Sequence, residues 1–64
     1  MVYNRIKAYI KANGIKQGWL AAQIKMPASK LSEILLGKRP LYADVLTLIC
    51  DALCVSSELF TKAP

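Results

Sequence analysis

The segment from Ala28 to Glu33 carries small and polar side chains whose chemistry suits the edges of base pairs. The methyl group of Ala28 can touch a thymine methyl, and the Ser29 hydroxyl can donate to or accept from any base. Lys30 can reach guanine or a phosphate, and Glu33 can accept a hydrogen bond from the amino group of cytosine. An alternative for Lys30 and Glu33 is a solvated helix surface with a weak ion pair.

Basic residues follow this segment in the sequence. Lys38 and Arg39 follow it and precede Pro40 in a basic loop, and the minor groove of DNA is one option for Arg39. Residues 1–39 contain eight of the nine basic residues and one acid, whereas residues 40–64 contain one base and three acids. With a net charge of +5, this division indicates one face that meets a polyanion and one that does not.

Two short helices position these side chains. Apolar residues recur with helical spacing at Leu20, Ala21 and Ile24, and again after a sharp corner at Lys25-Met26-Pro27. The sequence predicts helices over about residues 17–24 and 27–36, which together form a helix-turn-helix at about 17–36. The residues that we expect to hold the two helices at a fixed angle are Leu20, Ala21, Met26, Leu31 and Ile34.

Three more helices complete the prediction, at about residues 2–13, 42–53 and 57–60. Gly14 suits the left-handed residue that closes the first of them, and Ser56 suits the N-cap of the last. Val55, Leu59 and Phe60 are expected to complete the core. We expect one compact all-α domain of five helices over residues 1–64, frayed at residues 61–64.

The residue types argue against catalysis and against a metal site. The chain has no histidine, no thiolate beside a base and no convergent pair of carboxylates. Cys50 and Cys54 lie one helical turn apart and cannot close a zinc site alone, so we expect Cys50 buried, Cys54 near the surface and both reduced. We expect no cofactor and no small-molecule ligand. Without a signal peptide or a membrane-spanning run, we expect a soluble, cytoplasmic protein.

The chain resembles the Cro/C1-type helix-turn-helix family, also called the Xre family, of phage and bacterial repressors. The resemblance covers roughly residues 6–60 and rests on five short motifs: Ile15-Lys16-Gln17, Leu20-Ala21, Leu31-Ser32-x-Ile34, Gly37-Lys38-Arg39-Pro40 and Leu53-x-Val55-Ser56. It implies a lambda-repressor-like domain that binds double-stranded DNA at a pseudo-palindromic operator as a homodimer. It further implies a transcriptional regulator that represses by occupying its operator.

Residue roles follow from the resemblance. The family reads bases mainly from the first, second and sixth positions of the recognition helix, which are Ala28, Ser29 and Glu33 here, with Lys30 beside them. Backbone contacts are implied for Gln17 and for the loop of Lys38 and Arg39. Lys16 is a further candidate for a backbone contact, with a solvated surface charge as the alternative. The chain departs from the family at Lys25 and Cys54, where glycine is usual, and at Leu36, where asparagine is frequent. A lysine with positive φ is strained by about 1 kcal/mol relative to glycine.

Two questions stay open at this level. Trp19 can lie against the DNA sugar-phosphate backbone or fold over the edge of the core. The region around the loop after residue 35 is more apolar than a monomer requires. We expect its leucines, Leu35, Leu36 and Leu41, at or near a dimer interface. The alternative for the whole domain is a protein-interaction module, such as an antitoxin or an anti-repressor partner, that uses this apolar surface.

Overall fold

The computed structural model describes residues 1–61, and this part of the chain folds into five helices without a strand. The helices are α1 (Val2–Ala12), α2 (Gln17–Gln23), α3 (Ala28–Leu35), α4 (Ala43–Leu53) and α5 (Glu58–Thr61). The all-α, five-helix prediction is therefore confirmed. The predicted fraying concerns residues 62–64, which lie outside the described residues, and Thr61, which ends α5.

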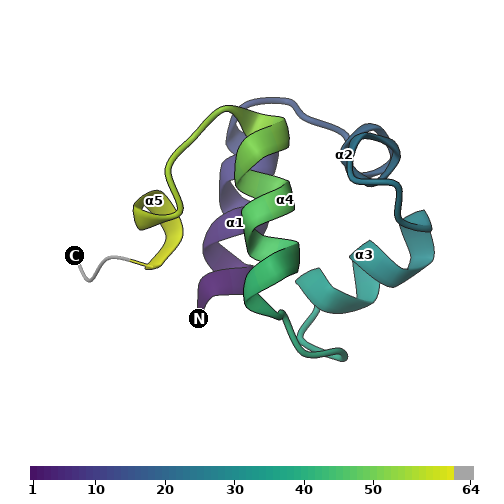
Figure 1. Ribbon diagram of the computed structural model, residues 1–64. Coiled ribbons are helices and arrows are strands. Elements are labelled where there is room, and N and C mark those ends of the chain that lie inside the picture. The colour runs from purple at the N-terminus through teal and green to yellow at the C-terminus, as the bar shows by residue number, and fades with distance from the viewer. Residues whose placement is uncertain (62–64) are drawn as a thin grey trace.

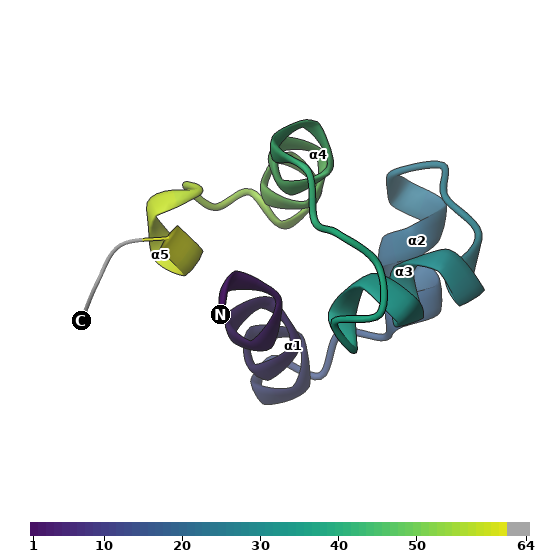
Figure 2. The same cartoon turned by 90° about the horizontal axis from the view of Figure 1, so that it is seen from below.

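The helices surround one shared interior. Helices α2 and α3 lie at one end of the molecule and α5 at the other, with α1 and α4 between them (Figure 1, Figure 2). Helix α1 contacts both α3 and α5, and α2 contacts both α3 and α4. Figure 1 shows α2 nearly end-on while α3 runs across the view, so the two short helices are steeply inclined to each other. Helix α3 therefore packs against both α1 and α2.

Every helix contributes side chains to the core. The buried residues are Ile6, Ile10, Leu20, Ala21, Ile24, Leu31, Ile34, Leu35, Ile49, Cys50 and Phe60. None of the buried residues among the described ones is polar or charged. Met26 is half-buried and packs against this cluster. The residues predicted to hold α2 and α3 together are thus core residues or pack on the core.

The two cysteines differ in their surroundings. Cys50 is buried and Cys54 is exposed, as predicted, and both are free thiols. Burial, with a smaller contribution from the negative charge of Asp51, raises the pKa of the Cys50 thiol. That thiol therefore stays protonated at neutral pH and behaves as a small apolar side chain.

Helices α1 to α4 all end in the same hydrogen-bonding pattern. At the end of α1, the Gly14 N–H donates to the Lys11 carbonyl at 3.3 Å and the Ile15 N–H donates to the Ile10 carbonyl at 2.9 Å. This pair of bonds is the Schellman motif, which requires a left-handed residue just past the helix. The left-handed residues are Gly14, Lys25, Gly37 and Cys54, with φ of 66°, 57°, 80° and 58°.

Lys25 and Cys54 adopt the left-handed conformation without being glycine. A side chain with a Cβ is disfavoured there by about 1–2 kcal/mol. The departures from glycine noted in the sequence therefore fall on the two positions at which this fold imposes backbone strain.

Replacing either residue with glycine is expected to stabilise the domain. Lys25→Gly and Cys54→Gly each relieve the strain, and part of the gain is lost because glycine makes the unfolded chain more flexible. We expect a net increase of about 0.5–1 kcal/mol in the free energy of unfolding for each variant, measured by urea denaturation. Lys25→Ala and Cys54→Ala keep the strained backbone and serve as controls that should show no such gain.

Candidate nucleic-acid interface

Helix α3 has one buried face and one exposed face. Leu31, Ile34 and Leu35 are buried, with the spacing of a helix stripe that faces the core. The residues predicted to read bases lie on the rest of the helix: Ala28, Ser29 and Lys30 are exposed, and Glu33 is partly exposed. All four residues predicted to read bases are therefore open to solvent, at least in part, on α3.

The loop after α3 begins with a tight turn at Gly37. The Gly37 N–H donates to the Ile34 carbonyl at 3.1 Å, and the Lys38 N–H donates to the Glu33 carbonyl at 2.9 Å. The chain reverses at Gly37, which is in the left-handed conformation, and both Lys38 and Arg39 are exposed after it; of the two, Arg39 reaches α3 with its side chain, at Glu33.

An ion pair joins the loop to the helix. The Arg39 Nε lies 3.1 Å from the Glu33 Oε2 and donates a hydrogen bond to it. This pair differs from the alternative considered in the sequence, in which Glu33 pairs with Lys30. Glu33 and Arg39 are six residues apart, and only the reversal of the chain at Gly37 brings them together. Because each side chain is about half exposed, the pair contributes at most about 1 kcal/mol to stability.

A small hollow lies between α3, the basic loop and the start of α4. Its volume is about 210 Å³, and it is lined by Lys30, Ile34, Arg39, Pro40, Tyr42 and Val45. Tyr42 is 64% exposed and was not predicted as a site residue. The signal that sequence reasoning missed is an aromatic residue three positions after a surface arginine, ahead of a new helix. The hollow combines two cations with an exposed aromatic ring.

The residues predicted to contact DNA at the start of α2 have no described polar side-chain contact with the α3 surface. Lys16 precedes α2 in an extended conformation and is exposed, and Gln17 is the first residue of the helix and is half-buried. No described hydrogen bond or ion pair links either side chain to the α3 surface. The candidate interface therefore has two parts: the α3 surface with its basic loop, and the start of α2.

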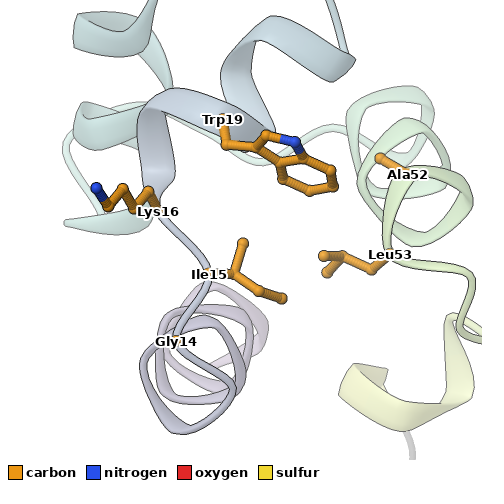
Figure 3. A pocket seen from close by; sticks show the side chains of 6 residues that line it. All are labelled: Gly14, Ile15, Lys16, Trp19, Ala52 and Leu53. Atoms are coloured by element: carbon orange, nitrogen blue, oxygen red, sulfur yellow. The ribbon is translucent and has the colours of Figure 1, made fainter.

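Trp19 lies over an apolar groove. The groove measures about 440 Å³ and is lined by Gly14, Ile15, Lys16, Trp19, Ala52 and Leu53. Figure 3 shows the indole ring extending from α2 toward Ala52 and Leu53 of α4, above Ile15. The side chain is 48% exposed, so it covers the edge of the core without being enclosed by it. Of the two options for Trp19, this position is nearer to the core-edge one.

The predicted apolar interface patch is only partly on the surface. Leu35 is 1% exposed and belongs to the core, because it lies one helical turn from Leu31 on the buried face of α3. Leu41 is half-buried and packs against the core, and Leu36 is 51% exposed. Leu35 is therefore removed from the candidate interface, and Leu36 is the residue of the three that is open to a partner.

A second correction concerns α5, where a residue predicted to be in the core is exposed. Phe60 and Val55 contribute to the core as predicted, but Leu59 is half exposed rather than buried. Leu48 on α4 is also exposed, although no surface role is predicted for it. Exposed apolar side chains therefore occur on α4 and α5 as well as at the end of α3.

Within residues 1–61, no helix is long and apolar enough to cross a membrane. Comparisons of the chain with protein-family models, with curated proteins and with solved structures found no match.

Proposed function

We propose that this chain is a Cro/C1-type helix-turn-helix domain that binds double-stranded DNA with sequence specificity and acts as a transcriptional regulator. The observation that carries the proposal is the surface of α3, whose polar face is exposed and carries Lys30, with Arg39 paired to Glu33 and Lys38 exposed in the loop that follows, while its other face is buried. A helix of this kind can enter the major groove, and the cations beside it can meet the phosphates on either side.

Base reading is assigned to the exposed face of α3. Ala28 offers a methyl group for thymine, Ser29 a hydroxyl for either base type, and Lys30 an ammonium group for guanine or a phosphate. Glu33 can accept a hydrogen bond from the amino group of cytosine, and it also pairs with Arg39. Backbone contacts are assigned to Lys38, Arg39, Gln17 and Lys16, with Trp19 as an additional candidate.

Lys38 gives the most direct test of phosphate contact. Lys38→Ala is expected to weaken binding to duplexes of every sequence alike. It should also flatten the plot of log affinity against log salt concentration by about one unit, because one phosphate contact is lost. Lys7→Ala, in which an exposed lysine of α1 is removed, makes the same change in net charge. If the two variants bind alike, Lys38 does not contact a phosphate.

Regulation is proposed to occur by occupancy. Two recognition helices about 34 Å apart would enter successive major grooves of a pseudo-palindromic operator, and the bound protein would obstruct polymerase. This mechanism needs a homodimer, for which Leu36 supplies exposed apolar surface at the end of α3, with half-buried Leu41 as a second candidate.

The dimer is expected to be weak alone and stronger on DNA. Sedimentation of the protein with and without operator duplex should show a monomer that becomes two copies per duplex. Leu36→Lys should lower the affinity for the full operator while leaving the affinity for a half-site unchanged. A wild-type protein that binds as one copy to an asymmetric site would contradict the dimer.

A protein-interaction module is the second candidate function. The groove beneath Trp19, with its apolar walls from α2 and α4, favours this reading. The two functions differ in their response to salt and to polyanions: DNA binding weakens steeply with salt and is competed by heparin, whereas binding through an apolar groove is affected little by either.

A further inference from the structure

Glu33 holds the basic loop through two groups. Its backbone carbonyl accepts the Lys38 N–H at 2.9 Å, and its carboxylate accepts the Arg39 Nε–H at 3.1 Å. The first bond fixes where the loop leaves α3, and the second fixes where the Arg39 guanidinium lies. A single acidic residue therefore sets the position of the neighbouring cation.

The ion pair leaves most of the guanidinium available. Arginine has five N–H donors, and among the described residues Arg39 uses only the one on Nε. The two terminal amino groups remain able to form the forked pair of hydrogen bonds that suits a phosphate. Arg39 also lines the 210 Å³ hollow together with Lys30 and Tyr42. An oriented arginine and a lysine thus share one small concave site.

Base reading by Glu33 does not account for this arrangement. An unpaired carboxylate on a face that meets DNA would repel the phosphates, and the affinity would fall unless a cytosine compensated. With Arg39 bound to it, the carboxylate is neutralised and at the same time orients a donor. An exposed pair of this kind adds little to stability, so its contribution to the fold does not explain it.

We infer that Glu33 is a positioning residue, which orients Arg39 so that Arg39 and Lys30 together bind one backbone phosphate of DNA in the hollow beside Tyr42. This inference rests on the proposed function. It moves Glu33 and Lys30 from base reading to backbone contact and leaves sequence recognition on α3 mainly to Ala28 and Ser29.

A double-mutant cycle tests the positioning role. Duplex affinity is measured for wild type, Glu33→Gln, Arg39→Ala and the double variant. Removing the negative charge of Glu33 raises the duplex affinity by lessening the long-range repulsion of the phosphates. This effect is the same whether Arg39 is present or replaced by alanine. With Arg39 present, Glu33→Gln also loosens the arginine, so the gain should be small or reversed. With Arg39 absent, the same substitution removes a bare carboxylate, so the gain should be larger by about threefold or more. Equal effects in both backgrounds, or a changed base preference for Glu33→Gln, would overturn the inference.

The salt dependence tests whether the two cations share one phosphate. If they do, the Lys30→Ala/Arg39→Ala double variant should flatten the plot of log affinity against log salt by about one unit in total. A flattening by about two units would mean separate phosphates and would contradict a shared site. Lys7→Ala/Arg39→Ala serves as the charge-matched control. A wild-type protein that binds no duplex would remove the proposed function and this inference together, whereas duplex binding without coupling would remove only the inference.

Discussion

Replacing Phe60 with alanine is expected to lower the free energy of unfolding by about 3–5 kcal/mol, a loss large enough to unfold much of so small a domain. Phe60 is 1% exposed, and its ring packs edge-to-face on Tyr9 of α1 with the ring centroids 5.7 Å apart. Helix α5 is only four residues long and contacts α1. Its attachment therefore depends largely on this one side chain, assisted by the Arg5 guanidinium, which donates to the Phe60 carbonyl at 3.3 Å.

Leu59→Ala provides a control in the same helix. Leu59 is 50% exposed, so truncating it should change the free energy of unfolding by about 0.5 kcal/mol or less. Urea denaturation of both variants measures the difference. Equal losses for the two would mean that α5 does not pack through Phe60 as described.

Gly37→Ala is expected to cost about 2–4 kcal/mol of stability, since two penalties combine. The residue has φ of 80°, which strains any side chain, and an added Cβ would lie 2.7 Å from the Tyr3 Oη and 2.8 Å from its Cζ. The phenol ring of α1 would have to move, or the turn after α3 would have to shift. Such a shift would also displace Lys38 and Arg39, so duplex binding should weaken along with stability.

Gly14→Ala separates the two penalties. Gly14 has a similar φ of 66°, but an added Cβ there meets no atom within 4 Å, so only the strain of about 1–2 kcal/mol remains. In a Tyr3→Ala background, Gly37→Ala should cost about as much as Gly14→Ala does. If Gly37→Ala is no worse than Gly14→Ala in the wild-type background, Tyr3 does not support the turn.

Helical periodicity predicted much of this fold because few contacts in it depend on distant pairing. The spacing of Leu20, Ala21, Leu31 and Ile34 placed all four in the core, where the structure has them. The polar face of α3 followed from the same spacing. Ser56 accepts a hydrogen bond from the Glu58 N–H at 3.3 Å, in keeping with its predicted capping role.

Which apolar residues are buried, and which charged residues pair, also depends on how the helices pack against one another, and helical spacing alone does not reveal this. Leu59 and Phe60 are adjacent apolar residues, and the approach of α5 to α1 decides which of them is buried. The prediction that Leu35 lies at a partner interface is wrong because its spacing from Leu31 places it on the buried face of α3. The pairing of Glu33 with Arg39 requires the chain to reverse at Gly37, and no helical spacing reveals it. The hollow beside Tyr42 draws on three parts of the chain and is visible only in three dimensions.

Selection of bound sites from random duplex DNA tests the central claim, sequence-specific DNA binding through α3, most directly. The wild-type protein should enrich a motif with two-fold symmetry, and its binding should weaken steeply with salt. Ser29→Ala should change the preference at one or two positions of that motif, at a cost of about 1–3 kcal/mol for the lost contact. A pool with no enriched motif, or an unchanged motif after Ser29, Lys30 and Glu33 are all replaced, would contradict the account.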